Sequence, residues 1–332
     1  MMRISKLIKM IKNDFPRIVF MGSPDFAVAT LKELIENKKN VVGVVTVPDK
    51  PAGRGQKIQP SPVKVFAQKY NIPVLQPESL KDPEFINTLK NNFKPDIQVV
   101  VAFRILPEEV WSLPPLGTFN LHASLLPQYR GAAPINWAII NGEKETGVTT
   151  FFINNGIDSG NILLQEKVTI GENETAGELE EKLKIIGARL VIKTLDGIIN
   201  NEIIPIKQET LIDNNILKKA PKIYKNDCKI DWSWNINYIY NFIRGLNPEP
   251  TAWCYWVSKN DQIMVKIYKA EKIFINHNTP FGTIESDGKK IIRISANDGY
   301  IEIKALQLPG KKVLNVEEFL RGFKNISNYK AI

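Results

Sequence analysis

The stretch "RIVFMGSPDFAVATLKELIENKKNVVGVVTV", residues 17–47, places two apolar runs on either side of a helical pattern. The first run ends at Gly22, and Ser23 then stands at the expected N-cap of a helix whose first position is Pro24. The second run covers residues 41–47. Because apolarity is continuous in both runs and does not alternate, they predict parallel strands that are buried on both faces.

The same pattern continues along the first half of the chain. The run "DIQVVVAF" (96–103) is another continuous apolar strand, and "SPVKVFAQKY" (61–70) and "DPEFINTLKNN" (82–92) have helical character. Strands that alternate with helices predict a doubly wound α/β sheet. Further elements are then expected as a strand before residue 127, a helix at 134–142, strands at 146–154 and 160–168, and a helix at 175–200.

The last third of the chain has a different pattern. Residues 201–223 lack a sustained period and are rich in polar side chains, so we interpret them as an interdomain linker. Beyond them, short β-rich runs such as "MVKIYKAEKI" alternate with Gly and Asn turns. This alternation predicts a small barrel.

Length and composition agree with two globular domains. The chain has 332 residues, 43% of them hydrophobic and 24% charged, and no apolar run approaches the ~18 residues of a membrane span. The N-terminal "MMRISKLIKMIKND" is basic but lacks a secretory apolar core. It is open to interpretation as a mitochondrial presequence, or as a short extension before a start at Met10.

Cysteine and histidine are scarce. Cys228 and Cys254 lie far apart, and His122 and His277 are the only histidines, which excludes a disulfide framework and a multi-histidine metal centre. We therefore expect a reducing cytoplasm and no bound metal, with the chemistry supplied by nitrogen and oxygen side chains.

Positive charge is concentrated towards the C-terminus. Residues 221–332 hold 17 Lys and Arg against 11 Asp and Glu, and residues 1–20 hold 5 against 1, which leaves the remainder close to neutral. A basic second domain has two interpretations, a surface that meets a polyanion or one that only confers solubility.

Polar side chains interrupt the apolar strand within "FNLHASLLPQYRGAAP", residues 119–134. On a strand, Asn120, His122 and Ser124 point to one side, and burying such groups without partners costs several kcal/mol. The row is either a hydrogen-bonded core network or a ligand site at the carboxyl end of the sheet. An amide and an imidazole placed there could stabilise the oxyanion of an acyl transfer to an amine.

A carboxylate is needed to orient the histidine and handle a proton. Asp158 in "NNGIDSGN" could serve, but it could equally cap its own turn, and spacing alone does not bring it to His122. The sequence has no G-x-S-x-G, no G-x-x-x-x-G-K-[ST] and no G-x-G-x-x-G. These absences favour direct transfer between two bound substrates.

Four segments together resemble the methionyl-tRNA formyltransferase family: "FNLHASLLPQYRGAAPINWAIINGEKETGVT", "GIDSGNIL", "VTVPDKPAGRGQK" and "IDWSWN". The resemblance covers about the whole chain from Arg17 onward. It implies a Rossmann-like formyltransferase domain at 17–204, a linker at 205–222 and a smaller OB-like β-barrel domain that binds tRNA at 223–332. Residues 1–16 are then an N-terminal extension.

The resemblance also implies the reaction. A formyl group would pass from 10-formyltetrahydrofolate, as co-substrate, to the amino group of methionyl initiator tRNA for translation initiation, in a cytoplasmic monomer. The catalytic residues of the family match Asn120, His122 and Asp158. His122, kept protonated by Asp158, and Asn120 would stabilise the oxyanion, while Asp158 would help move the amine proton to the leaving folate nitrogen. The family's folate contacts match Ser124, Leu125, Leu126 and Pro127.

The basic loop "PDKPAGRGQK" (48–57) carries Lys50, Arg54 and Lys57. Such a loop is either solvated or in contact with phosphate. The resemblance implies contact with the acceptor end of the tRNA, with Arg54 at the initiator stem and the basic C-terminal domain outside the acceptor arm. We expect four tryptophans of that domain to lie in its core rather than to stack on bases, namely Trp232, Trp234, Trp253 and Trp256.

The chain departs from the family at "AFRILP" (102–107), which is one residue shorter than in many relatives and has Arg104 near the usual glycine. That segment lines the folate pocket in the family, so its contacts to the pterin ring are open. Ser159 replaces a common threonine, a conservative change. Rival interpretations are formylation of glycinamide ribonucleotide or of a UDP-linked amino sugar, hydrolysis of formyl-tetrahydrofolate, and an RNA-binding protein with an inactive catalytic domain.

Overall fold

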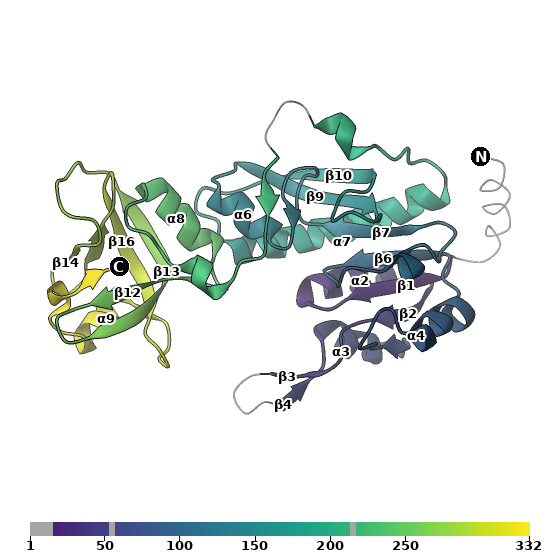
Figure 1. Cartoon of the computed structure of the whole chain (residues 1–332), viewed down its shortest axis with the longest axis horizontal. Helices are drawn as coiled ribbons and strands as arrows, with labels where there is room; N and C mark the ends of the chain where they lie inside the picture. The colour runs from purple at the N-terminus through teal and green to yellow at the C-terminus, as the bar shows by residue number, and fades with distance from the viewer. Residues whose placement is uncertain (1–15, 53–56, 213–216) are drawn as a thin grey trace. The chain divides into compact units, whose positions relative to one another are not determined.

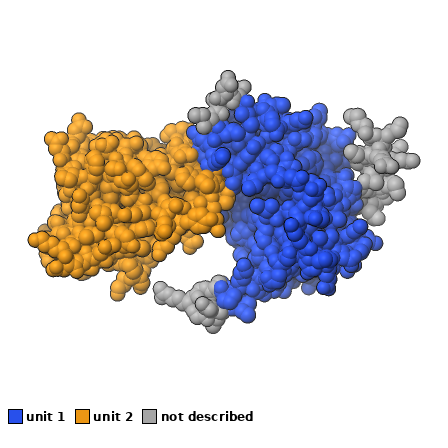
Figure 2. All heavy atoms as spheres, in the orientation of Figure 1, with its two compact units in different colours: residues 1–131, 146–168, 180–219 blue, residues 132–145, 169–179, 220–332 orange. Residues whose placement is uncertain are grey.

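The computed structural model describes residues 16–52, 57–212 and 217–332 (Figure 1). The chain forms two compact units, which Figure 2 distinguishes by colour. The first unit comprises residues 1–131, 146–168 and 180–219, and the second comprises residues 132–145, 169–179 and 220–332. In the described ranges, no helix combines the length and apolarity that crossing a membrane requires. The expected N-terminal extension lies outside these ranges apart from Pro16.

A seven-stranded sheet forms the centre of the first unit, in the order β10-β9-β7-β6-β1-β2-β5. The pairs β1–β2, β1–β6, β2–β5 and β6–β7 are parallel, and β9 runs antiparallel to β7. The predicted α/β sheet with continuously buried strands is therefore confirmed, with an antiparallel edge added. Its strands are β1 (Ile18–Gly22), β2 (Val41–Val45), β5 (Val74–Leu75), β6 (Ile97–Val101), β7 (Thr118–His122), β9 (Glu145–Phe152) and β10 (Ile162–Thr169).

Helices connect these strands near the positions that the sequence predicts. The helix α2 is capped by Pro24 and not by Ser23, because the extended backbone continues one residue further than expected. Ser61 caps α3 as a hydroxyl acceptor for the Lys64 amide. The predicted helix at 82–92 is two elements, α4 and a π-helical turn. The bounds are α2 (Asp25–Glu36), α3 (Pro62–Lys69), α4 (Pro83–Thr88), the π-helical turn Leu89–Phe93, α5 (Glu108–Trp111), α6 (Pro134–Ile140) and α7 (Ala176–Ile199).

The second unit is built on an antiparallel sheet in the order β14-β15-β16-β13-β12-β18, with β17 paired to β16. A bridge between Thr283 and Lys330 joins its two ends, and the Ala331 amide donates to the Gly282 carbonyl at 2.7 Å. The expected OB-like barrel is therefore confirmed as a nearly closed sheet. Its strands are β12 (Ala252–Val257), β13 (Gln262–Ile273), β14 (Ile284–Ser286), β15 (Ile292–Ser295), β16 (Tyr300–Gln307), β17 (Leu314–Asn315) and β18 (Lys330–Ala331).

Two helices, α8 (Ile236–Gly245) and α9 (Val316–Gly322), complete the core of this unit. Trp232, Trp253 and Trp256 are buried among the barrel residues. Trp234 is partly buried and packs edge-on against Tyr238. The prediction that these tryptophans belong to a core is confirmed, so they are not available as base-stacking platforms.

Closure of the barrel depends on the close approach of two backbones at Gly282. A Cβ atom there would lie 2.0 Å from the Ala331 carbonyl oxygen, and the residue has φ +78°. We expect Gly282→Ala to lower the free energy of unfolding by roughly 3 kcal/mol or more. The change is measured by urea unfolding followed through tryptophan fluorescence.

Gly288→Ala is the matched control, because Gly288 has φ +72° but no atom within 4 Å of its Cβ position. This control should lose only about 1 kcal/mol, the cost of the backbone conformation alone. Equal losses in the two variants would show that closure at Gly282 does not stabilise the barrel.

Candidate active site

Strand β7 presents Asn120 and His122 at the carboxyl end of the parallel sheet. The His122 ring is buried, and its Nε2 donates to the Tyr129 carbonyl oxygen at 2.8 Å. The strand ends at His122, so the expectation that Ser124 continues the polar row is wrong. The hydroxyl of Ser124 instead donates to the Gln128 carbonyl at 2.7 Å, in the turn that follows.

Asp158 lies close to His122 although 36 positions separate them in the sequence. Its Oδ2 is 3.8 Å from His122 Nδ1 and accepts a hydrogen bond from the Gly131 amide at 2.9 Å. The residue has φ +48°, a left-handed conformation that its surroundings must maintain. The fold thus supplies the proximity that spacing alone did not predict.

Gln208 supports this arrangement, although no sequence pattern points to it. Its buried amide nitrogen donates to the carbonyls of Asp158 at 2.9 Å and Gly160 at 2.8 Å. Its oxygen accepts from Arg130 Nε at 3.0 Å and Nη2 at 2.6 Å. Gln208 lies in the segment that the sequence predicts to be a linker. Local sequence patterns there give no sign of contacts with residues so far away in the chain.

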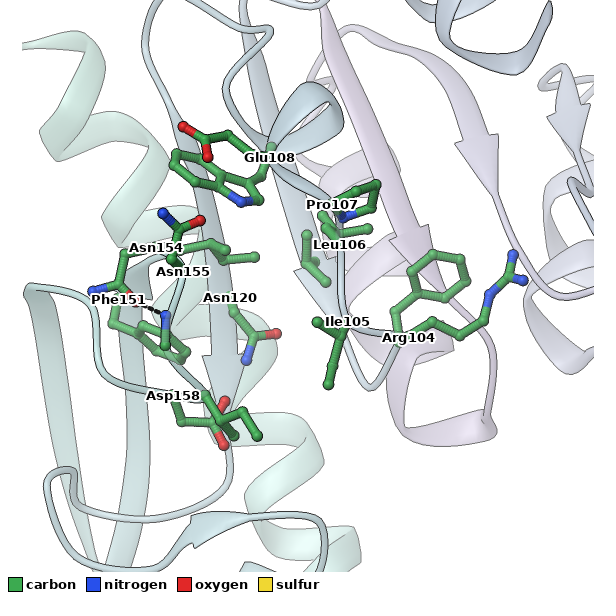
Figure 3. A pocket seen from close by; sticks show the side chains of 16 residues that line it. Arg104, Ile105, Leu106, Pro107, Glu108, Asn120, Phe151, Asn154, Asn155 and Asp158 are labelled. Carbon is green, nitrogen blue, oxygen red and sulfur yellow. Dashed lines mark hydrogen bonds between the residues drawn. The ribbon is translucent and has the colours of Figure 1, made fainter. Parts of the chain in front are cut away.

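A cavity of about 260 Å³ opens beside these residues (Figure 3). Asn120 and Asp158 point into it from neighbouring elements, and the "AFRILP" segment and the loop 153–157 contribute its other walls. Mostly apolar walls with a few convergent polar groups are typical of small-molecule sites. Other polar side chains also line the cavity, among them those of Glu108, Asn154 and Asn155. Its large apolar side chains include Phe103, Leu106, Trp111, Phe151 and Ile153.

Some of the predicted site residues do not line this cavity. His122 lies behind Asp158, and the four predicted folate contacts lie outside the lining. Within their turn, the Thr149 hydroxyl donates to the Ser124 carbonyl at 2.6 Å and accepts from the Leu126 amide at 3.1 Å. The turn therefore braces the end of β7. The predicted contacts concerned are Ser124, Leu125, Leu126 and Pro127.

The predicted basic loop forms a hairpin of β3 (Lys50–Ala52) and β4 (Lys57–Gln59) that extends from the first unit (Figure 1). Lys50 is exposed, and Arg54 lies outside the described residues. At the base of the hairpin, Asp49 accepts from Lys64 at 2.6 Å and from Gln76 at 2.7 Å. These hydrogen bonds, that from Lys64 first, lower the pKa of Asp49.

Both cysteines are buried free thiols. Burial raises the pKa of Cys254 to about 12 and that of Cys228 to about 11, so both remain neutral thiols near pH 7. Residues 16–52, 57–212 and 217–332 contain no group of three or more His, Cys, Asp or Glu side chains that could hold a metal ion.

Comparison with known proteins identifies the family. The sequence model of the formyl transferase family matches residues 16–195, and that of the formyl transferase C-terminal domain matches residues 222–324. The chain is 52% identical over 320 residues to the methionyl-tRNA formyltransferase of Bacteroides thetaiotaomicron, covering 96% of this chain and 99% of the relative. The chain belongs to the methionyl-tRNA formyltransferase family. The methionyl-tRNA formyltransferase of Flavobacterium johnsoniae is 51% identical, with coverage of 92% and 96%.

Solved structures agree with this family. The sugar 3N-formyl transferase WlaRD, solved with dTDP and 5-N-formyl-THF, superposes with a TM-score of 0.62 at 25% identity, covering 90% of this chain and 99% of that one. The N-formyltransferase from Helicobacter canadensis, solved with folinic acid and dTDP-3-aminofucose, gives 0.60 at 27% identity, with coverage of 87% and 98%. The predicted resemblance is confirmed, and so is the Rossmann-like formyltransferase fold.

Gln208 offers a direct test of how the site is supported. Gln208→Leu leaves two carbonyls and the Arg130 guanidinium without their partner, so Asp158 should lose its fixed position. We expect the kcat of formyl transfer to fall at least about tenfold while the barrel still folds.

Gln165→Leu is the matched control for this prediction. Gln165 also donates two hydrogen bonds, to the Leu126 carbonyl and to Thr149 Oγ1, each at 2.9 Å, but does not contact Asp158. Its kcat should stay within about twofold of the unchanged protein, and its loss of stability should be the smaller of the two because Gln165 is exposed whereas Gln208 is buried. Similar kcat values for the two variants would contradict a role for Gln208 in holding Asp158.

Proposed function

We propose that the chain transfers the formyl group of 10-formyltetrahydrofolate to the α-amino group of methionyl initiator tRNA, giving N-formylmethionyl-tRNA for translation initiation. The observation that carries the proposal is that Asn120 and Asp158 face one cavity, with His122 at 3.8 Å from the carboxylate. Relatives with the methionyl-tRNA formyltransferase name match nearly the full chain, which supports the choice of acceptor.

Asn120 is the residue we assign to the formyl oxygen. Its side chain lines the cavity and has no hydrogen-bond partner among the described residues. The amide is therefore free to donate when the methionyl nitrogen attacks the formyl carbon and that oxygen gains negative charge. One donor of this kind contributes ~10²–10³ in rate.

His122 acts from behind the cavity wall in this proposal. The Tyr129 carbonyl can only accept, so Nε2 carries a proton, and Nδ1 faces the Asp158 carboxylate. A doubly protonated ring presents a donor to each oxygen. Its positive charge then balances Asp158 and stabilises the nearby oxyanion.

Asp158 is assigned to proton transfer. Its Oδ2 accepts from the Gly131 amide and lies 3.8 Å from His122 Nδ1, while Oδ1 has no hydrogen-bond partner among the described residues. As the new N–C bond forms, Oδ1 accepts the proton that leaves the methionyl amine. When the bond between the formyl carbon and N10 of folate breaks, that proton passes to N10, so the charges balance.

The formyl donor would occupy the described cavity. The mostly apolar walls suit a flat ring system, and Asn154, Asn155 and Glu108 offer polar contacts at its edge. The solved relatives with 5-N-formyl-THF and folinic acid support a folate, and the 10-formyl form is our proposal. Of the predicted contacts Ser124, Leu125, Leu126 and Pro127, only Leu125 is not fully buried, so it is the one available to the part of folate beyond the cavity.

The tRNA would contact two regions, the hairpin of the catalytic domain and the C-terminal domain. We propose a catalytic domain at 17–204, a linker at 205–222 and a tRNA-binding domain at 223–332, whose excess of positive charge suits the phosphates. The hairpin residues Lys50, Arg54 and Lys57 would approach the acceptor end. We further propose a cytoplasmic monomer, since two buried free cysteines suit a reducing compartment.

Variants of the cavity residues test the proposed function. We expect Asn120→Ala to lower kcat by about 10²–10³-fold in single-turnover formyl transfer, and Asp158→Asn by about 10² or more, with small effects on KM. Asn155→Ala, in the same cavity, should instead raise the KM for the formyl donor and leave kcat within a few fold. Retention of more than about a tenth of the activity by Asn120→Ala would contradict the oxyanion role.

The hairpin base gives a second prediction. Lys64→Met removes the cation that holds Asp49, the residue directly before β3, so the hairpin should lose its fixed direction. We expect the KM for tRNA to rise about threefold to tenfold and the KM for the formyl donor to stay unchanged.

The matched control is Lys193→Met, which removes an exposed pair with Glu166 at 3.5 Å. It should alter neither KM. Equal effects of the two lysine variants on the KM for tRNA would show that the hairpin base is not involved in tRNA binding.

A further inference from the structure

The cavity wall at residues 103–107 is held in an unusual way. This segment follows Ala102, which has φ +47°, and it forms neither helix nor strand. In the described part of the chain, the backbone groups of residues 103–106 have no hydrogen-bond partners. The conformation of this wall is therefore not fixed by its own backbone, although it lines the cavity throughout.

The side chain of Arg104 supplies the missing link. Its Nη2 donates to the Pro77 carbonyl at 2.8 Å and its Nη1 to the Glu78 carbonyl at 3.0 Å. Pro77 and Glu78 follow the edge strand β5, so the link joins the cavity wall to the outer part of the sheet. Figure 3 shows the guanidinium directed away from Asn120 and Asp158, whereas Ile105 lies between it and them.

The guanidinium of Arg104 suits the two carbonyls in both geometry and chemistry. A planar guanidinium offers two parallel donors, which suits two consecutive carbonyls, and charge-assisted hydrogen bonds are stronger than neutral ones. The guanidinium also lies 5.3 Å from the Phe103 ring centre, while its Nε is buried without a partner. Burial lowers the pKa of Arg104, but an arginine stays charged near pH 7. The two carbonyls therefore account for the position of this charge.

We propose that Arg104 is a positioning residue for the formyl donor. It fixes the backbone of residues 103–107 in the conformation that receives the donor, and leaves the peptide groups of that wall free to bind it. The inference rests on the proposed function, because it assigns the cavity to the donor. It also explains how a shortened segment with arginine near the usual glycine can still form the wall.

The test compares Arg104→Met and Arg104→Lys with Arg17→Met. Arg17 also donates to two carbonyls, to that of Phe93 at 2.9 Å and that of Asn92 at 3.5 Å, but it does not line the cavity. Tetrahydrofolate binding is measured by titration without tRNA, and KM and kcat are measured in formyl transfer. Thermal unfolding of each variant reports stability separately.

Arg104→Met should raise the Kd for tetrahydrofolate and the KM for the donor about tenfold, with kcat within about twofold and the KM for tRNA unchanged. Arg104→Lys keeps the charge and one donor, so it should recover part of the affinity, and Arg17→Met should bind the donor normally. If Arg104→Met does not fold, Arg104→Lys is compared with Arg17→Lys instead. Only Arg104→Lys should then lose affinity for the formyl donor.

Three results would overturn the inference. Equal donor affinity in the Arg104 and Arg17 variants at equal stability would reduce Arg104 to a structural residue. A loss for tetrahydrofolate but not for a pterin without the glutamate tail would show direct contact with the donor's carboxylate. Neither binding nor transfer by the unchanged protein would overturn the proposed function itself, and with it this inference.

Discussion

The position of the Asp158 carboxylate is the constraint on which the rest of the site depends. Oδ2 accepts from the Gly131 amide and faces His122, and Gln208 holds the main chain from the other side. Three distant parts of the chain therefore meet around this carboxylate, namely the end of β7, the loop after β9 and the turn at residue 208. The left-handed backbone at Asp158 persists because these contacts determine it.

The row that we propose to be catalytic and the cavity that we propose for the donor are separable in this chain. Asn120 and His122 belong to a buried strand whose neighbours fix its register, so their geometry follows from the sheet. The cavity wall at 103–107 has no such register, and it is tied to its surroundings by the hydrogen bonds of Arg104 and by the burial of Leu106 in the core. Sugar formyltransferases with 25–27% identity share the fold. This is consistent with one catalytic centre that serves different acceptors through its surroundings.

Sequence patterns predicted the elements with strong local signals. Continuous apolarity in "RIVFM" and "DIQVVVAF" identified buried parallel strands. Of the four tryptophans expected in the C-terminal core, three are buried in it and Trp234 packs against it. Predictions that required knowing where an element ends were less accurate, as for Ser23 at the helix cap and Ser124 beyond the strand. Gln208 could not have been predicted, since its partners lie 48 to 78 residues away and no local sequence pattern reflects contacts of that range.

The central claim is that methionyl initiator tRNA is the acceptor. The most direct measurement offers the purified protein 10-formyltetrahydrofolate with methionyl initiator tRNA, methionyl elongator tRNA and glycinamide ribonucleotide, each in a separate reaction. The account predicts formyl transfer to the initiator tRNA at a kcat/KM well above the other two. Equal or preferred transfer to the small amine would contradict it, and would leave the catalytic centre in place with a different acceptor.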